Sequence, residues 1–358
     1  MRSAVARVWL PVLAAAGGLA GLDRRADAGD LLYFVHRGER LLSAHWASVY
    51  ADRELQSGPL QLVVAGVARR TDVLAFVVES GVAGLLVFVL GRLGVAGRWR
   101  LLAGLGAVAA GLTHGAFVEG HPAEAITPLL WLLAAIDARR GRTGRAGALL
   151  GLSAGLELWG ALGVPVLLLA PRIRDAVRGA AVEAVVIAAQ LVPFVAFSDF
   201  RMFDYQWRVA RGTLLSLVVP AGTHFGWPLR LVQAAVACGI GAVLARRLRR
   251  TVHAVWLVPL SVAVARILFD PLSYGWYWLE AEALTLVGAA LAAERTLPSL
   301  VRGRTAASPV DPSSYGRALP FLRRSEVRYG HSGTVPTCDG SVSIAPQGAR
   351  RGNGRDCP

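Results

Sequence analysis

The chain has 358 residues, of which 54% are hydrophobic and only 17% charged, and its mean hydropathy is +0.47. Soluble domains average roughly 25% charged residues, so this composition excludes an ordinary soluble domain and a disordered chain. Three cysteines are too few for a disulfide scaffold. All 38 basic residues are arginine and the net charge is +14, but long apolar runs separate the charges, which excludes a nucleic-acid-binding protein. The composition predicts an all-α polytopic membrane protein with its charges in the loops.

Apolar runs of nearly membrane-spanning length recur along residues 1–302, which we interpret as one transmembrane domain. A helical span needs about 20 mostly apolar residues, and eight runs approach that length. Two shorter apolar pieces, 59–68 and 212–219, predict half-helices or short interfacial helices. The eight predicted spans lie at about residues 8–22, 73–91, 101–118, 123–138, 179–198, 228–245, 253–269 and 279–293.

The placement of arginine predicts the orientation of these spans. Arginine clusters fall at 92–100, 139–145, 172–178 and 246–250, and cytoplasmic loops carry the excess of basic residues. This predicts a multi-pass protein of the plasma membrane with a cytoplasmic N-terminus. Ala26-Asp-Ala28 resembles a signal-peptide cleavage site after the first apolar run. The later spans require an N-inside start, so we expect an uncleaved anchor.

Residues 146–170 are apolar but have arginine clusters at both ends. A single crossing would place one of those clusters outside. Two short helices hinged near 157–160 would enter and leave on the same side, as a re-entrant hairpin. Broken backbone at membrane depth requires cover by protein or a water-filled cavity, so a hairpin here indicates a working cavity. The alternative is one tilted helix and a local exception to the charge rule.

Residues 303–358 differ from the rest of the chain. They are rich in Ser, Gly, Pro and Arg and lack apolar periodicity, which predicts a disordered basic cytoplasmic tail. Cys338 and Cys357 in this segment, together with Cys238 in a predicted span, have no metal-ligand spacing.

The first predicted outside loop runs from about 23 to 57. Within it, residues 30–45 have apolar side chains at helical spacing, which is typical of an amphipathic helix at a membrane interface. Asp30 stands at the start of this helix. Its position favours an N-cap, where the carboxylate accepts hydrogen bonds from free backbone N–H groups.

The second outside region, residues 113–125, concentrates His and Glu at the junction of two predicted spans. Ionisable groups there are costly unless they are paired or wet, and their spacing matches no strong zinc motif. His121-Pro122 marks a helix start, with Glu124 near the positive end of that helix. Glu119 and His121 remain available for contacts with a polar ligand.

The third outside region, residues 197–212, interleaves arginines with aromatic residues. The aromatics fit the belt expected at a membrane interface. Arginine outside is less expected, and Arg201 and Arg208 could hold a phosphate group by bidentate hydrogen bonds.

The fourth region, residues 265–284, places Arg266 near the outer end of an apolar run. Its partner is either Asp270, four residues later, or an anionic ligand. The aromatic run 274–278, which includes Tyr277, fits the membrane belt, and its ring faces also suit stacking on a sugar.

In this order, the features resemble the integral-membrane GT-C type glycosyltransferases, in particular the bacterial polyprenyl-phosphate-mannose-dependent mannosyltransferases. The resemblance covers about residues 5–298. It rests on the acid that opens the first outside loop, the Gln56-Ser-Gly-Pro-Leu60 turn, and the late aromatic loop. It also rests on GHPAEAITPLLWLLAAIDARRGR followed by AGALLGLSAGLELWGALGVPVLLLAPR. The chain departs from these relatives at the Gln56 turn and at Glu157, where they often have Lys.

The resemblance implies transfer of a hexose, mannose in the expected case, from a polyprenyl-phosphate sugar to a lipid or glycan acceptor on the extracytoplasmic face. By position Asp30 would be the general base, with Asp27 as the fallback. Arg201, Arg208 or Arg266 would neutralise the phosphate. The expected sugar contacts are Glu119, His121 and Tyr277.

No cofactor is expected, although a divalent cation is compatible with the chemistry. No nucleic-acid partner is expected, and nothing resembles a nucleotide-binding domain. Two other classes remain open. A lipid transporter or flippase predicts an inverted repeat, which the two halves of the sequence do not show. A non-catalytic membrane subunit leaves the acidic and aromatic outer loops unexplained.

Overall fold

The computed structural model describes residues 2–23 and 29–305, which are almost entirely helical. In this part of the chain three helices are long and apolar enough to cross a membrane. A bent pair that turns by 41° would form a fourth span. The described chain is therefore nearly all helical, with helices of the length and composition of membrane spans. The three helices are α4 (Thr71–Arg92), α9 (Ile173–Phe197) and α10 (Trp227–Leu248), and the pair is α5 (Gly97–Ala109) with α6 (Leu112–Val118).

Length and composition thus support three or four of the eight predicted spans. The predicted span 101–118 is interrupted at Gly111, which has a positive φ of 86°. Other predicted spans coincide with helices that are shorter or more charged: α11 has 15 residues, and the 18 residues of α7 include Asp137 and Arg139. The helices at these other positions are α1 (Arg2–Asp23), α7 (Pro122–Arg139), α11 (Ala254–Leu268) and α12 (Trp278–Thr305).

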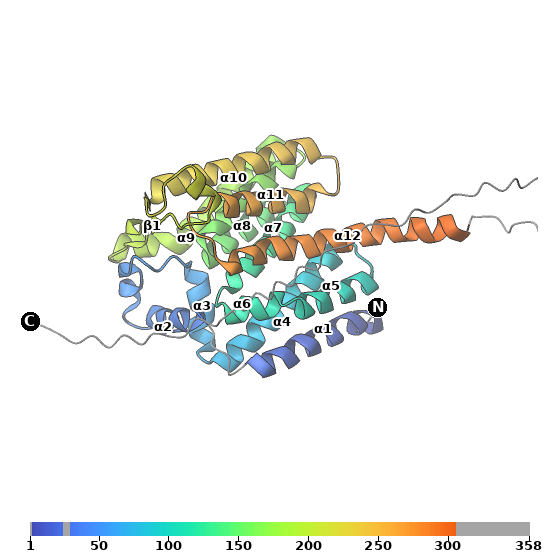
Figure 1. Ribbon diagram of the computed structural model, residues 1–358, viewed down its shortest axis with the longest axis horizontal. Helices are drawn as coiled ribbons and strands as arrows, with labels where there is room; N and C mark the ends of the chain where they lie inside the picture. The colour runs from blue at the N-terminus through green and yellow to red at the C-terminus, as the bar shows by residue number, and fades with distance from the viewer. Residues whose placement is uncertain (1, 24–28, 306–358) are drawn as a thin grey trace, which may run out of the picture. The chain divides into compact units, whose positions relative to one another are not determined.

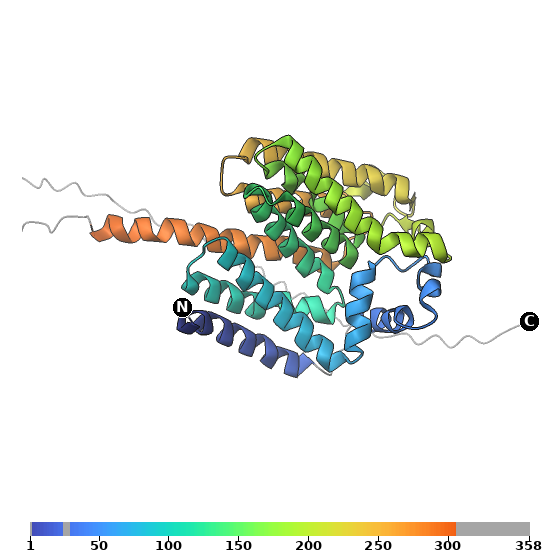
Figure 2. The same ribbon diagram turned by 180° about the vertical axis from the view of Figure 1, so that it is seen from behind.

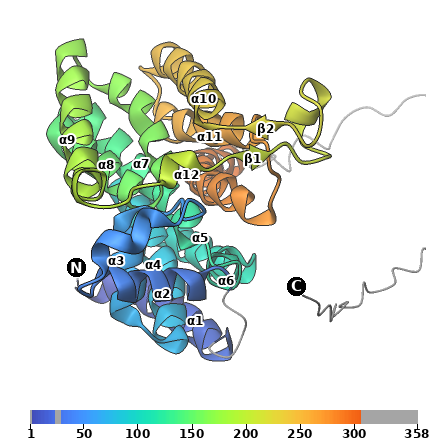
Figure 3. The same ribbon diagram turned by 90° about the vertical axis from the view of Figure 1, so that its left-hand side faces the viewer.

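The helices pack as two groups with α7 and α12 between them (Figures 1 and 2). In one group α1 packs against α4 and α5; in the other α8 (Thr143–Leu156) packs against α9, and α10 against α11. Helix α7 contacts both α4 and α8, and α12 contacts both α5 and α11, as Figure 3 shows from the end. The last described helix, α12, continues past the predicted boundary at 302 and ends at Thr305. The predicted tail lies outside the described residues from 306 onward.

Residues 143–169 form a helical hairpin and not one tilted helix. Helix α8 ends at Leu156, Glu157 is extended, and the 3-10 segment η2 (Leu158–Leu169) folds back along α8. The Ser153 hydroxyl donates to the Gly160 carbonyl over 3.0 Å, and a Cβ at Gly160 would lie 2.2 Å from the Ser153 carbonyl carbon. The hinge predicted near 157–160 is therefore confirmed.

Three glycines on one side of α8 set its distance from α9. Gly147, Gly151 and Gly155 recur every four residues, and a Cβ at Gly147 would lie 2.0 Å from the Gly179 carbonyl oxygen. A Cβ at Gly151 would lie 2.5 Å from the Cβ of Val186. Small residues allow helix backbones to approach closely inside a membrane protein. This close packing fixes the hairpin, including its tip at residue 157.

The amphipathic segment predicted at 30–45 forms α2 (Leu31–Leu41), but its apolar face is covered by protein. This face packs on α3 (Pro59–Ala68), where a Cβ at Gly38 would lie 2.1 Å from the Leu62 carbonyl oxygen. An adjacent helix of the same chain therefore buries this face, and the position of α2 at a membrane surface stays a prediction. The buried residues of α2 are Leu31, Phe34, Val35 and Gly38.

Short elements complete the described part of the chain. The strands β1 (Trp207–Arg208) and β2 (His224–Phe225) pair antiparallel, with Trp207 opposite Phe225. The apolar piece 212–219 forms only a 3-10 turn, η4 (Leu214–Leu217), within it. The other 3-10 turns are η1 (Trp46–Ala51), η3 (Met202–Asp204) and η5 (Gly275–Tyr277).

Candidate functional site

A glycine places Asp30 beside the turn that precedes α7. Gly29 has a φ of +51°, and a Cβ there would lie 2.7 Å from the Glu119 carbonyl oxygen. A larger residue would be strained and would clash, so only glycine allows the start of α2 to contact this backbone. The contact brings Asp30 next to His121, which is 91 positions away in the chain.

Asp30 and His121 form a hydrogen-bonded pair. The Nε2 atom of His121 lies 3.1 Å from Oδ2 of Asp30, whose side chain is 63% exposed. Asp30 occupies the N-cap position of α2, yet its carboxylate makes no capping hydrogen bond. The capping role favoured by its position is therefore wrong, and the carboxylate remains accessible. The hydrogen bond from His121 holds the pKa of Asp30 below its usual range.

Aromatic rings hold His121 in place. The His121 ring stacks on Trp276 at 4.5 Å between centroids, and Trp276 stacks on Tyr274 at 4.2 Å. Phe34 from α2 contacts the His121 ring edge-on at 6.0 Å. Because Tyr274 is 40% exposed, the stack leads from the Asp30 carboxylate to an aromatic surface open to solvent.

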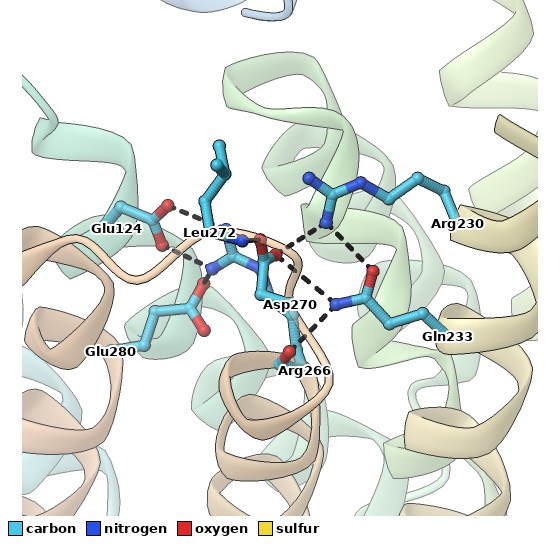
Figure 4. A network of polar contacts seen from close by, with 7 residues as sticks. All are labelled: Glu124, Arg230, Gln233, Arg266, Asp270, Leu272 and Glu280. Atoms are coloured by element: carbon cyan, nitrogen blue, oxygen red, sulfur yellow. Dashed lines mark hydrogen bonds and ion pairs between the residues drawn. The ribbon is translucent and has the colours of Figure 1, made fainter. Parts of the chain in front are cut away.

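Arg266 lies behind this surface in a buried ion-pair network (Figure 4). Its guanidinium donates to both carboxylate oxygens of Glu124 over 2.8 and 3.0 Å, and to Glu280 over 2.8 Å. All three side chains are only 1% exposed. The predicted partner Asp270 is therefore wrong for Arg266. The two glutamates already occupy the guanidinium that was expected to meet a phosphate.

Asp270 instead pairs with Arg230 of α10, a residue that the sequence patterns did not single out. Arg230 Nη1 lies 2.6 Å from Asp270 Oδ2, and both are buried. Gln233 joins the two pairs, since it accepts from Arg230 over 2.9 Å and donates to the Arg266 carbonyl over 2.9 Å (Figure 4). A lone arginine in an otherwise apolar run was the available signal for a buried pair.

Tyr277 lies beneath the surface. It is only 8% exposed, and its ring centroid is 4.8 Å from the guanidinium carbon of Arg266. It therefore covers Arg266. The sequence predicts Tyr277 as a sugar contact, but its buried ring offers no accessible face to a sugar. Trp276 and Tyr274, in the same aromatic run, have the accessible positions.

Arg201 and Arg208, two of the three arginines in the 197–212 segment, are exposed. Arg201 pairs with Asp204 over 3.2 Å, and its backbone N–H donates to the Tyr50 carbonyl over 2.8 Å, which ties the segment to the first outside loop. Arg208 stands on β1 and makes no ion pair within the described part of the chain. Both guanidinium groups are thus open to an anion.

The Gln56-Ser-Gly-Pro turn contacts the hairpin tip. Ser57 forms an isolated β-bridge with Glu157, and the Gly58 N–H donates to the Leu156 carbonyl over 3.0 Å. A Cβ at Gly58 would lie 2.2 Å from the Gly155 carbonyl oxygen, so the contact requires glycine. The tertiary structure thus joins two segments that are a hundred residues apart in the sequence.

An apolar cavity of about 80 Å³ lies next to the Asp30–His121 pair. Leu31 and Pro122, the residues that follow this pair in the chain, both line it, as does Leu156 at the hairpin tip. Val64 and Val77 also line it, and each is more than 40% exposed, so the cavity lies at the outer surface of the helices. A polar, accessible carboxylate and an apolar cavity therefore stand side by side.

Glu119 has no side-chain contact within the described residues that assigns it a role, and Asp27 cannot be placed. The Glu119 side chain is exposed, two residues before His121, and Asp27 falls in 24–28, outside the described residues. Within the described residues, no group of three or more His, Cys, Asp or Glu side chains is placed to hold a metal ion. Comparison of the chain with protein-family models, curated proteins and solved structures finds no match.

Proposed function

We propose that the protein is an integral-membrane glycosyltransferase that moves a hexose, mannose in the expected case, from a polyprenyl-phosphate sugar to a lipid or glycan acceptor. The supporting observation is the Asp30 carboxylate, which is exposed, free of its capping role and oriented by His121. The proposal places Asp30 at the extracytoplasmic face of the plasma membrane. It includes eight spans, a hairpin that enters from the cytoplasmic side, and a cytoplasmic tail.

The proposed reaction is a single displacement at the anomeric carbon. Asp30 accepts the proton of the acceptor hydroxyl as that oxygen bonds to the anomeric carbon, and the bond from this carbon to the phosphate oxygen breaks. The lipid phosphate leaves as an anion, so no strong general acid is required. Since the pKa of Asp30 is held low, the carboxylate is ionised and ready to accept the proton at neutral pH.

The groups around Asp30 divide the remaining tasks. His121 orients the carboxylate, Trp276 and Tyr274 offer ring faces to the sugar, and Glu119 contacts sugar hydroxyls. The adjoining apolar cavity receives the first part of the isoprenoid chain, and the rest of that chain lies in the bilayer.

The exposed guanidinium groups of Arg201 and Arg208 neutralise the phosphate in this proposal. Arg266 does not take that part, because Glu124 and Glu280 already surround its guanidinium. A divalent cation is compatible with the same chemistry but is not required by it.

The test is transfer of label from radioactive polyprenyl-phosphate mannose to extracted lipid or glycan acceptors in membranes that contain the chain. Asp30→Asn should lower the rate about 10²–10⁴-fold, the range for loss of a general base. Asp199→Asn is the matched control, because Asp199 is exposed and belongs to another loop. The melting temperature of Asp30→Asn should fall only slightly, since the side chain caps no helix and is 63% exposed.

Full activity in Asp30→Asn would refute the assignment of the base. If the native chain gives no product, the donor and acceptor class is wrong. A transporter or flippase, the second candidate class, would then show movement of labelled lipid across reconstituted vesicles. A non-catalytic subunit would show neither transfer nor movement.

A further inference from the structure

Two cavities adjoin at the arginine-rich end of the helices, away from Asp30. The first has a volume of about 260 Å³ and contains three arginines in its lining, together with Ala170. The second has a volume of about 250 Å³ and is lined almost entirely by apolar side chains of η2, α9 and α10. They form one groove, because both are lined by Leu168, Ile173 and Ala176.

The first cavity offers positive charge without a protein anion to meet it. Its arginines are Arg172, Arg246 and Arg249, and none of them forms an ion pair within residues 2–23 and 29–305. Arg249 donates to the carbonyls of Ala170 and Pro171, which fixes its position. Arg172 and Arg246 are exposed. Arg172 also stands at the N-cap position of α9 without a capping hydrogen bond, and the free backbone N–H groups and the helix dipole there add positive charge.

The second cavity continues from the charged one along the helices. The segment η2 contacts both α9 and α10, which lie apart in Figure 3. Along α9 the lining extends from Ile173 to Ala180, a rise of about 10 Å at 1.5 Å per residue. Ile173 is 67% exposed and Val177 63% exposed, so this side of the groove faces the surroundings of the helices. In a membrane protein those surroundings are lipid.

We propose that this groove binds an anionic phospholipid, with its phosphate at Arg172, Arg246 and Arg249 and an acyl chain between η2, α9 and α10. Basic pockets between membrane helices bind anionic head groups. The choline of a zwitterionic lipid would bring a positive charge to the same arginines. The groove lies at the base of the hairpin and Asp30 near its tip, so this site is separate from the proposed donor site and does not depend on it.

The test measures binding of lipids to the purified full-length chain in detergent, by native mass spectrometry. The probes are dioleoyl-phosphatidylglycerol, dioleoyl-phosphatidylcholine and inorganic phosphate. We expect phosphatidylglycerol to bind in preference to the other two. The variant R172Q/R246Q should bind phosphatidylglycerol roughly thirtyfold more weakly. This factor corresponds to a loss of about 1 kcal/mol of binding free energy for each of the two arginines. Arg249 is left intact because it holds backbone carbonyls.

The matched control is R98Q/R142Q, which removes the same charge from exposed arginines that line neither cavity. This control should bind phosphatidylglycerol like the native chain. Ala180→Phe fills the apolar part and should weaken binding of phosphatidylglycerol without changing that of phosphate.

Four results would overturn the proposal. They are equal binding of both lipids, an equal loss in the control, competition by phosphate as strong as by the lipid, and a dimer whose dissociation follows Ala180→Phe while lipid has no effect. The last result would assign the groove to a second copy of the chain.

Discussion

Replacing Arg266 with methionine should strongly destabilise the protein. Methionine has an unbranched side chain, as arginine does, but cannot donate the hydrogen bonds to Glu124 at 2.8 and 3.0 Å and to Glu280 at 2.8 Å. Both glutamates are 1% exposed, so water cannot replace the lost donor. Two carboxyl groups would then share a buried site with no cation.

Arg266→Met should lower the free energy of unfolding by an amount near the upper end of about 3–5 kcal/mol, the range for breaking a buried ion pair by removing one partner. Replacing the whole network should be much less harmful, because neutral groups of similar volume often substitute for buried ions at little cost. The triple variant R266M/E124Q/E280Q should therefore recover most of the loss.

The assay is the free energy of unfolding in mixed micelles, from denaturant titration. Arg201→Gln is the matched control: Arg201 is exposed and pairs only with an exposed Asp204, an interaction worth less than about 1 kcal/mol. If R266M unfolds within about 1 kcal/mol of the native chain, the network does not depend on Arg266. Such a result would return Arg266 to the role of anion binder.

Other predictions concern the site and the packing that positions it. His121→Phe should slow sugar transfer and shift the acid limb of the pH–rate profile towards higher pH, because the His121 hydrogen bond lowers the pKa of Asp30. An unchanged pH profile of the transfer rate in His121→Phe would contradict the role of His121 in orienting Asp30. The contribution of this hydrogen bond to folding stability is present above the ordinary aspartate pKa of about 3.9. It is lost as the pH falls through the lower pKa that Asp30 has in the folded chain. Trp276→Ala should raise the KM for the sugar donor, measured in the transfer assay, and an unchanged KM would exclude Trp276 as the sugar platform. Gly38→Ala should destabilise the chain by about 1–3 kcal/mol through overpacking against α3, measured by thermal unfolding, whereas Gly18→Ala, whose Cβ meets no atom within 4 Å, should not.

Local patterns in the sequence predicted the helical class, the position of α2 and the hinge of the hairpin. The periodicity of α2 is visible because helical residues three and four apart share a face, and the hinge follows from arginine at both ends of one apolar segment. The same patterns did not reveal what covers the apolar face of α2. That depends on Gly38 and Gly66 meeting across two helices, and no periodicity records the partner of a small residue.

The partners of the charged residues depended wholly on the tertiary structure. Spacing suggested that Arg266 would meet Asp270, four residues later, but the helix ends before Asp270, which turns towards Arg230 instead. Arg266 pairs with Glu124, 142 positions away, and Asp30 meets a histidine 91 positions away. The sequence by itself determined which residues carry charge into an apolar chain and that a buried arginine such as Arg266 needs a partner, since an unpaired buried charge is costly. Only the packing of helices distant in the sequence decided the partners of Arg266 and Asp270, and left the Asp30 carboxylate open to solvent beside an apolar cavity.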